Sequence, residues 1–344
     1  MHLEQFGWND FFAQHLPQDA VAGRVAAASR EHFLVWMAES EIEASVSGHL
    51  RHSSFDWPSV GDWVVLRQDS PVITRVLPRR TKISRKHPGK EIREQILAAN
   101  IDVLFIVSSL DRDYNPRRLE RYLVLTSQSG VRPVILLNKA DLLHDAHLHS
   151  IVAETRQLRV GTPVVPLSAL YGSGIRSIAE FLAPGETGAL VGSSGVGKST
   201  LLNALLAEER QRTYPVRRND QRGRHITTRR ELFLMPEGWL LMDLPGLREL
   251  HLWADPDQLD ASFDDIQLLA RNCRFRDCTH TTEPGCAVQS AGLDQGRMVN
   301  YRKLQRELAF LERQNDALSR MEHKRKLKQL FRAHERQQRH RSKP

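Results

Sequence analysis

Positions 192–199 read Gly192-Ser193-Ser194-Gly195-Val196-Gly197-Lys198-Ser199, between the apolar run 189–191 and a helical run that starts near Leu201. This stretch fits the pattern G-x-x-x-x-G-K-[ST]. Glycines let a backbone wrap a phosphate so that successive N–H groups point at it, and the following helix directs its positive end at the same anion. We expect Lys198 to neutralise the β- and γ-phosphate oxygens and the Ser199 hydroxyl to ligate Mg²⁺. With Thr200, the stretch predicts a phosphate-binding loop that joins a strand to a helix.

A second motif, Asn138-Lys139-Ala140-Asp141, directly follows the apolar run 134–137. It lies at the carboxyl end of a predicted strand, where ligands bind in open parallel sheets. The Asp141 carboxylate can accept hydrogen bonds from the N1–H and 2-amino groups of guanine, and adenine lacks both donors. Asn138 can brace the loop, and the Lys139 stem can lie against the base. The motif therefore favours a guanine nucleotide.

Two further segments complete the predicted site. Ser168-Ala169-Leu170 follows the run 164–167 and can offer a backbone N–H to the guanine carbonyl. Asp243-Leu244-Pro245-Gly246 follows the run 240–242. There Asp243 can hold a Mg²⁺-bound water, and the Gly246 N–H can reach the γ-phosphate. Together the four segments predict GTP or GDP and Mg²⁺ as ligands.

The order of these motifs is unusual, because the guanine motif precedes the phosphate loop, whereas most GTPases begin with that loop. The same sheet can form from a chain cut and rejoined elsewhere, since the termini of compact domains often lie close together. Strand-like runs alternate with helical patterns over residues 102–252, which indicates a mostly parallel sheet covered on both faces. We predict a circularly permuted α/β P-loop GTPase domain over residues 93–252.

The residues before this domain follow a different pattern. Five short runs rich in Val, Ile and Trp are separated by Gly, Pro, Ser and Asp; they cover residues 24–29, 33–38, 42–46, 61–66 and 72–77. This spacing predicts a small antiparallel β-barrel, an OB-fold, over residues 23–92. A lead-in helix is expected over residues 1–22. Such barrels often bind nucleic acid, although an unrelated docking role also fits the fold.

All three cysteines of the chain lie within fourteen positions, as Cys273, Cys278 and Cys286, together with His280. Three thiolates and one imidazole complete a closed tetrahedral Zn²⁺ shell with no open position for catalysis. We therefore predict a structural zinc-binding domain over residues 253–344. It continues into a basic helix whose apolar face contains Tyr301, Leu304, Leu308, Leu311 and Leu318. A second histidine cluster has no cysteine beside it and is interpreted as a solvated helix face: His144, His147 and His149.

Charge is distributed unevenly along the chain. The formal net charge is +8, but residues 297–344 contain 15 Lys and Arg against 5 Asp and Glu, a net of +10. A basic arm on a near-neutral body suggests a polyanionic partner such as RNA, although a solvated charged helix gives the same signal. The apolar runs are far shorter than the ~20 residues of a membrane span, and no secretory signal is evident. We expect a cytoplasmic, monomeric protein without membrane contact.

Together these features resemble the RsgA (YjeQ) family of circularly permuted bacterial GTPases over nearly the whole chain. The resemblance implies binding to the small ribosomal subunit and its rRNA near the decoding region. It also implies that the subunit stimulates GTP hydrolysis and that hydrolysis accompanies release. The family's switch segment corresponds to residues 223–228, in which Thr227 is the expected ligand of Mg²⁺ and the γ-phosphate. Ile226 replaces the usual threonine, so Thr228 stays an alternative.

The residue after D-x-x-G is Leu247, which cannot orient an attacking water as the glutamine of Ras-like proteins does. Either the chain hydrolyses GTP poorly or another group takes this role. His225 is the expected candidate, with Lys198 and Thr227 completing the catalytic set. The main hypothesis is a GTPase of late small-subunit maturation. The alternatives are a non-catalytic GTP-responsive RNA-binding switch and an ATP-dependent kinase, which the guanine motif disfavours.

Overall fold

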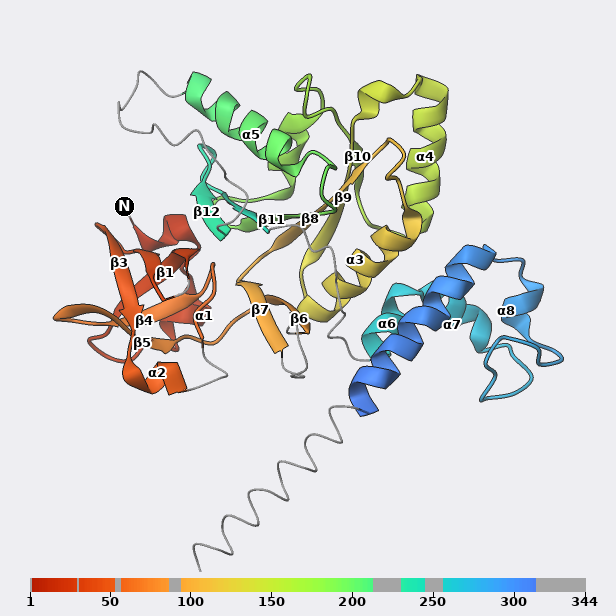
Figure 1. Ribbon diagram of the computed structural model, residues 1–344, viewed down its shortest axis with the longest axis horizontal. Helices are drawn as coiled ribbons and strands as arrows, with labels where there is room; N and C mark the ends of the chain where they lie inside the picture. Colours follow the sequence, from red (N-terminus) through yellow and green to blue (C-terminus); the bar gives the residue numbers. More distant parts are fainter. Residues whose placement is uncertain are drawn as a thin grey trace, which may run out of the picture.

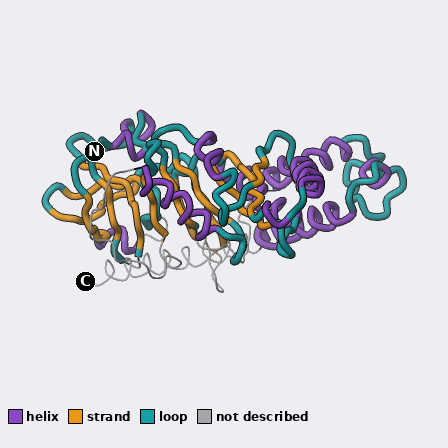
Figure 2. Tube along the Cα trace, turned by 90° about the horizontal axis from the view of Figure 1, so that it is seen from above, coloured by secondary structure: helices purple, strands orange, loops and turns teal. Residues whose placement is uncertain are grey.

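The computed structural model of the 344-residue chain describes residues 2–29, 31–52, 57–86, 94–212, 230–244 and 256–313. Three parts follow one another along its longest axis (Figure 1). A barrel lies at one end, an α/β domain in the middle, and a group of helices at the other end. Seen from above, the strands fill the first two parts and the C-terminal part is helical (Figure 2).

The N-terminal part is a five-stranded barrel, as the five apolar runs predicted. Its strands are β1 (Val21–Ala28), β2 (Phe33–Trp36), β3 (Glu41–Val46), β4 (Trp63–Arg67) and β5 (Ser70–Val76). Strand β1 pairs antiparallel with both β2 and β4, and β3 pairs with β5, which closes the barrel around buried apolar side chains. Short helix α2 (Gly48–His52) follows β3.

The lead-in segment forms two short helices instead of one. These are η1 (Leu3–Phe6) and α1 (Asp10–Ala13). Gly7 ends the first helix with a φ of 86°, a left-handed conformation that glycine adopts without strain. Asn9 then caps the second helix by accepting a hydrogen bond from the Phe11 amide at 3.1 Å. The break therefore has two local causes in the sequence.

The central domain is a six-stranded sheet in the order β10-β9-β8-β11-β13-β12, parallel except for β12. The strands are β8 (Val103–Ser109), β9 (Arg132–Asn138), β10 (Val164–Pro166), β11 (Thr187–Val191), β12 (Arg230–Leu234) and β13 (Leu240–Asp243). This arrangement confirms the predicted fold class. Every residue of β8 and β11 is buried, as in a sheet with helices on both faces.

Helices cover the two faces of the central sheet in separate groups. Apolar residues of α3 (Pro116–Ser129) and α4 (Asp145–Gln157) pack in one cluster with Ile106 and Ile135 of the sheet. Residues of η3 (Ile175–Phe181) and α5 (Lys198–Arg212) pack in another cluster, on Phe105 of the opposite face. A single turn of 3₁₀ helix, η2 (Ala140–Leu142), lies between β9 and α4.

Two strand pairings were not predicted. Strand β12 pairs antiparallel with β1 of the barrel, so that barrel and central domain share one eleven-stranded sheet. In addition, β6 (Lys82–Lys86) and β7 (Glu94–Ala99) form a separate two-stranded sheet. The hairpin spans the predicted boundary at residue 92, and the predicted domain limits stay a proposal.

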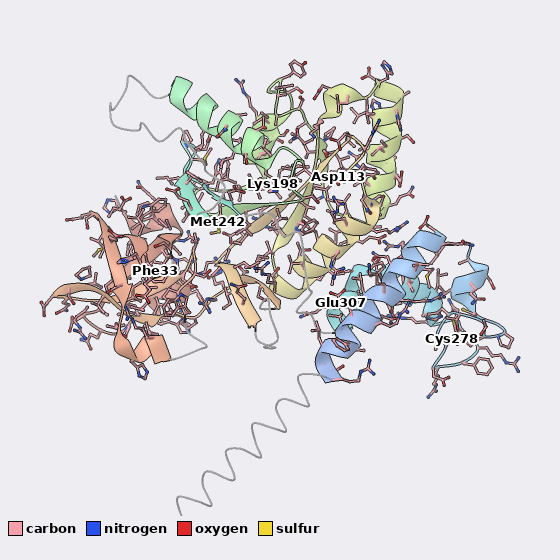
Figure 3. The ribbon with its side chains drawn as sticks, in the orientation of Figure 1. Phe33, Asp113, Lys198, Met242, Cys278 and Glu307 are labelled. Carbon is pink, nitrogen blue, oxygen red and sulfur yellow. The ribbon has the colours of Figure 1, made fainter. Side chains whose placement is uncertain are left out.

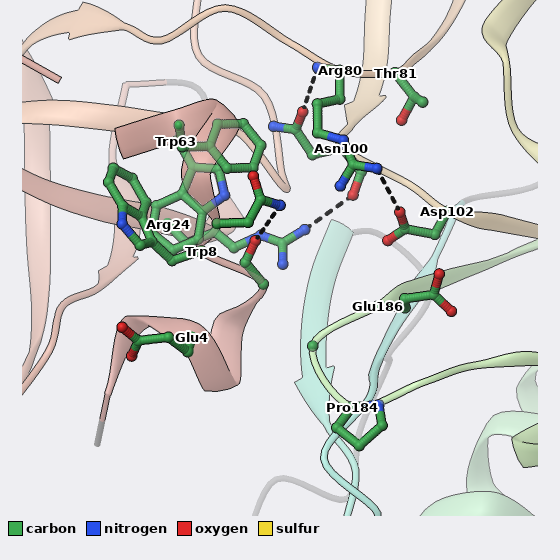
Figure 4. Close-up of a pocket in the computed structure, with 14 residues that line it drawn as sticks. Glu4, Trp8, Arg24, Trp63, Arg80, Thr81, Asn100, Asp102, Pro184 and Glu186 are labelled. Carbon is green, nitrogen blue, oxygen red and sulfur yellow. Dashed lines mark hydrogen bonds and ion pairs between the residues drawn. The ribbon is translucent and has the colours of Figure 1, made fainter. Parts of the chain in front are cut away.

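Buried Arg24 of β1 ties the barrel to the central domain at a pocket of about 200 Å³ (Figure 4). Its guanidinium donates to the Asn100 carbonyl at 3.1 Å and to Thr187 Oγ1 at 2.8 Å. Burial lowers the pKa of Arg24 to about 10, with Asp102 and Asp62 acting in the opposite direction. The pocket lies at the amino ends of β8 and β11, away from the edge where the predicted nucleotide motifs lie.

The C-terminal part contains α6 (Pro256–Ser262), α7 (Asp264–Ala270), α8 (Ala287–Ser290) and a helix over residues 295–313. Helix α6 and the helix over residues 295–313 pack beside α3, and α8 lies farther out (Figure 1). The predicted apolar face is buried at Tyr301, Leu304, Leu308 and Leu311, and Leu318 lies outside the described residues. Within the described part of the chain, every helix is too short or too polar to span a bilayer.

Candidate functional site

The predicted nucleotide motifs gather at one edge of the central sheet, at the carboxyl ends of its parallel strands. Asn138 ends β9, Gly192 directly follows β11, and Asp243 ends β13. Ser168 and Ala169 follow shortly after β10. Segments that lie as far apart in the sequence as residues 138 and 243 therefore meet at the position where open parallel sheets bind ligands.

Asn138 joins three of these segments with one buried side chain, of which 2% is exposed. Its Nδ2 donates to the carbonyl of Val196 in the phosphate loop at 2.8 Å. Its Oδ1 accepts from the backbone N–H of Ala169 at 2.9 Å. Because the amide is paired at both ends, it fixes the guanine motif, the Ser-Ala segment and the phosphate loop relative to one another.

Lys139 extends from the same loop across the edge of the sheet. It adopts a left-handed backbone conformation, with a φ of 63°. Its ammonium donates to the Gly195 carbonyl at 2.9 Å and to Asp111 Oδ2 at 2.7 Å. The hydrogen bond from Lys139 is the main cause that lowers the pKa of Asp111 to about 2. Asp111 was not predicted as a site residue, although it lies only three positions after the end of the strand-like run 103–108.

The guanine-reading positions differ in exposure. Asp141 is exposed within η2, and no hydrogen bond or ion pair is found for its carboxylate among the described residues. Ser168 and Ala169 are buried, and the Ser168 N–H donates to the Ser173 carbonyl at 2.9 Å. The arrangement leaves the Asp141 carboxylate available to a ligand. Beside it, hydrogen bonds from the backbone of Ser168 and Ala169 fix the Ser-Ala loop.

The phosphate loop depends on glycine at two crowded positions. Gly192 has a φ of 153°, and a Cβ atom there would lie 2.3 Å from the Val107 carbonyl oxygen. Gly197 has a φ of 95°, and a Cβ atom there would lie 2.3 Å from Asn138 Nδ2. A side chain at either position would displace a neighbour, because real Cβ contacts are never this short. Ser194, Gly195, Ser199 and Thr200 are exposed around the loop and the start of α5.

Lys198 lies across the phosphate loop at the first position of α5. Its ammonium donates to the carbonyls of Gly192 at 2.7 Å and Ser193 at 2.8 Å. Burial lowers the pKa of Lys198, while the charge of Asp243 acts in the opposite direction. The cation is thus already placed beside the loop that would hold the phosphates.

Asp243 has a buried carboxylate oxygen that a metal ion could bind. It is 8% exposed, and its Oδ1 atom is buried without a hydrogen-bond partner among the described residues. Burial raises the pKa of this carboxyl, against the effect of Lys198. A carboxylate oxygen with no partner beside a lysine suits Mg²⁺, either directly or through water. Gly246, Leu247, His225, Thr227 and Thr228 lie outside the described residues.

The metal-ligand cluster lies between α7 and α8 (Figure 3). Its four ligand atoms, from Cys273, Cys278, His280 and Cys286, lie within 4.8 Å of one another. His280 Nδ1 is 3.6 Å from the Cys273 sulfur and 3.5 Å from the Cys286 sulfur. Such a cluster fits a tetrahedral zinc ion.

The loop around the cluster is fixed by Glu283. Its carboxylate accepts from the backbone N–H of Thr279 at 3.0 Å and from that of Thr281 at 2.8 Å. His280 lies between these two residues with a φ of 58°. The three histidines of the other sequence cluster lie at the N-cap and on the first turns of α4, and all are exposed: His144, His147 and His149.

Comparison with known proteins identifies the family. The sequence model of the RsgA GTPase family matches residues 76–253. The chain belongs to the RsgA GTPase family. A protein of Opitutus terrae named small ribosomal subunit biogenesis GTPase RsgA is 44% identical over 98% of both chains. One of Oceanobacillus iheyensis, named small ribosomal subunit biogenesis GTPase RsgA 1, is 40% identical over 96% of this chain and 98% of its own.

Solved structures agree with this membership. The crystal structure of YjeQ from Thermotoga maritima aligns with a TM-score of 0.63 and 27% identity, covering 84% of this chain and 99% of that one. YloQ, described as a circularly permuted GTPase, aligns with a TM-score of 0.57 over 85% of this chain and 96% of its own, at 24% identity. As a member of the RsgA GTPase family, the protein is a GTP hydrolase, and the order of its motifs is the permuted order.

Proposed function

We propose that this RsgA-family GTPase binds the small ribosomal subunit and its rRNA, hydrolyses GTP to GDP and phosphate late in subunit maturation, and couples hydrolysis to its release. The proposal that the protein binds GTP depends on one observation. The Asn138 side chain makes two hydrogen bonds that hold the guanine motif and the phosphate loop together in one site. The names of the relatives support the ribosomal part.

The described site residues and Thr227 each have a role in this proposal. Asp141 accepts from the guanine edge, and the Lys139 stem lies against the base. The loop over residues 192–197 surrounds the phosphates, and Lys198 neutralises their charge. Ser199, Thr227 and, through water, Asp243 would hold a Mg²⁺ ion, which offsets the negative charge that develops during phosphoryl transfer.

Hydrolysis needs a group that orients the attacking water, and Leu247 cannot do so. We propose His225 for this role, supplied by the arginine-rich segment 210–230, with eight arginines. Turnover is expected to be slow for the protein alone and faster when a partner holds this segment against the nucleotide. Thr227 remains the proposed switch threonine, with Thr228 as its alternative.

The surface of the zinc-binding domain supports an RNA partner. Arg274 and Arg276 are exposed between the first two cysteine ligands, and the Arg274 guanidinium lies 5.5 Å from the Phe275 ring centroid. Phe275 as a residue is 40% exposed. Arginine and an exposed aromatic ring are suited to phosphates and unpaired bases. We further propose one structural zinc ion, a monomeric state and a cytoplasmic location.

Two measurements test the proposal. The protein is pelleted with small subunits, large subunits or bare RNA, in the presence of GDP or a non-hydrolysable GTP analogue. Binding that is selective for small subunits and stronger with the analogue is expected; equal binding to all three would contradict the ribosomal assignment. GTP turnover of His225→Ala with small subunits should fall by about 100-fold if His225 orients the water. Undiminished stimulated turnover would remove His225 from the role.

A further inference from the structure

Helix α3 contacts the phosphate loop with its first turn. The Nη1 atom of Arg118 donates to Ser193 Oγ at 2.6 Å and to the Asp113 carboxylate at 2.6 Å. Ser193 is the second residue of the phosphate loop, directly after Gly192. Through a charged donor, Arg118 therefore ties the start of this loop to the segment that leads into α3.

The backbone beneath Arg118 is well fixed. Asn115 caps α3, and its side-chain oxygen accepts from the N–H of Arg117 at 3.0 Å and that of Arg118 at 3.3 Å. Pro116 occupies the first helical position, where its missing N–H costs no hydrogen bond. Further along the helix, Leu119 and Tyr122 are buried in the core cluster. Arg118 thus extends from an anchored helix end.

The preceding residue contacts a different part of the molecule. The Arg117 guanidinium pairs with Glu120 on α3 and with Asp294, which lies just before the helix 295–313 of the C-terminal domain. Two consecutive residues of α3 therefore hold two separate structures. Arg118 holds the phosphate loop, and Arg117 holds the zinc-binding domain.

A buried ion-pair network strengthens the second contact. Glu120 is 2% exposed and accepts from Arg297 Nη1 at 2.9 Å and from Asn300 Nδ2 at 2.6 Å. Arg297, 6% exposed, also pairs with Asp265 of α7 at 2.7 Å. Separating such buried charges without replacing their partners is strongly unfavourable. The C-terminal domain is therefore expected to follow any movement of α3.

We propose that Arg118 is a positioning residue of the nucleotide site, and that α3 couples the phosphate loop to the zinc-binding domain through the adjacent contacts of Arg118 and Arg117. Ser193 cannot shift around the phosphates without either straining or breaking its hydrogen bond to α3. The coupling acts in both directions, because a coupling free energy between two sites is reciprocal. This inference rests on the proposed nucleotide site and is independent of the ribosomal partner.

A double-mutant cycle tests the first half of the proposal. The dissociation constant of a fluorescent GDP analogue is measured for the full-length chain and for Arg118→Met, Ser193→Ala and the double variant. Arg118→Met should weaken binding about tenfold, as expected for loss of a hydrogen bond from a charged donor. The double variant should bind no more weakly than the weaker single variant. Effects that multiply in the double variant would overturn the proposal.

Conservative replacement distinguishes positioning from general stability. Arg118→Lys keeps the charge, but a lysine ammonium does not reach as far along the side chain as the Nη1 atom that serves both Asp113 and Ser193, so partial recovery of GDP affinity is expected. The thermal midpoints of Arg118→Met and Arg118→Lys should match each other. If affinity follows the thermal midpoint across the variants instead, Arg118 stabilises the fold and does not position the loop.

The second half concerns the C-terminal domain. Arg121 of α3 pairs with Glu307 of the helix 295–313 (Figure 3 labels Glu307). Glu307→Gln removes the negative charge of this ion pair and so weakens the contact between α3 and the C-terminal domain. Glu312→Gln is the matched control, because Glu312 is exposed on the same helix. Glu307→Gln should change the ratio of the dissociation constants for GDP and a non-hydrolysable GTP analogue about fivefold, and Glu312→Gln should leave it unchanged.

The same pair of variants is then measured in the Arg118→Met background. There Glu307→Gln should no longer change the ratio, because the connection to the loop is gone; a change that persists would refute coupling through Arg118. All of these measurements are made on the protein without ribosomal subunits. If subunit pelleting fails while the cycles behave as stated, the ribosomal proposal fails alone. If the cycles fail while stimulated turnover persists, only the coupling proposal is lost.

Discussion

The side chain of Asn138 donates to the carbonyl of Val196 at 2.8 Å, across the edge of the central sheet. This hydrogen bond joins the loop that reads the base to the loop that surrounds the phosphates. The bond connects the end of β9 with the loop that follows β11, and these two strands are separated by β8 in the sheet. The integrity of the site therefore depends on a side chain that need not contact the nucleotide.

Replacing Asn138 by alanine should damage the site. The Val196 carbonyl and the Ala169 amide would both lose their partner, and each unsatisfied buried group costs about 1–3 kcal/mol. We expect GDP and GTP affinities, measured by titration calorimetry, to fall by about 10- to 100-fold. The control is Asn203→Ala, since Asn203 is exposed on α5. Equal affinities for the two variants would show that the bridge has no role in binding.

Asp141→Asn should change which base the site accepts. The carboxylate accepts from the guanine N1–H and 2-amino groups, whereas an asparagine amide can donate to the 2-oxo group of xanthine. GTP affinity should fall at least about 100-fold and xanthosine triphosphate affinity should rise. Asp145→Asn makes the same charge change at an exposed position in the first turn of α4 and should bind as the unchanged protein does. Competition between the two nucleotides for one fluorescent analogue gives the answer.

Asp243 should make the nucleotide-free protein less stable as the pH rises. Burial raises the pKa of Asp243 in the folded state above the unfolded value of about 3.9. The folded state therefore holds its proton more tightly, and the stability contribution is lost as the pH rises from the unfolded pKa through the raised folded pKa. Asp243→Asn should remove this loss, which gives a higher thermal midpoint at neutral pH without nucleotide.

The same substitution should abolish the benefit of Mg²⁺. An asparagine lacks the negative charge that a hard cation prefers, so Mg²⁺ should no longer increase GTP affinity in Asp243→Asn. Thermal midpoints measured with and without Mg²⁺-GTP between pH 5.5 and 8, roughly the range of greatest protein stability, test both effects. A variant that is less stable than the unchanged protein and still responds to Mg²⁺ would contradict the role given to Asp243.

Removing the zinc ion should unfold the cysteine-bearing loop and leave the barrel folded. Cys278→Ser replaces one thiolate ligand, and structural zinc sites supply most of the folding free energy of small loop-rich units. We expect less than about one tenth of a zinc ion per chain by elemental analysis. Amide exchange should become fast over residues 271–290 and stay slow in β1 and β4. Slow exchange in the loop of a zinc-free variant would mean that Glu283 and the packing of Val288 suffice.

The central fold could be predicted because its strands carry two signals at once. Strands such as Val103–Ser109 are continuous apolar runs, as burial on both faces demands. The motifs that follow these strands then identify which ends share an edge, and their order reveals the permutation. The metal cluster could be predicted equally well, because its ligands lie close together in the sequence and cysteine is rare in this chain.

Other features could not be predicted because they depend on contacts between distant residues. The hairpin β6–β7 has a polar first strand, Lys82–Lys86, and its pairing has no local apolar signature. The pairing of Ala28 with Arg230 joins residues two hundred positions apart. Asp111 and Arg118 were missed for a similar reason. Their partners, Lys139 and Ser193, belong to other segments, and nothing in the local sequence indicates the contact.

The ladder between β12 and β1 has a mechanical consequence. Arg230 is both the last residue of the arginine-rich segment 210–230 and the first residue of β12, and it pairs with Ala28 of the barrel wall. A displacement of β12 along its own axis would therefore act as shear on the barrel, without any intervening hinge. To swivel independently, the barrel would have to break backbone hydrogen bonds first. Through the pairing of β12 with β13, the barrel strand β1 and Asp243 at the end of β13 thus belong to one hydrogen-bonded sheet.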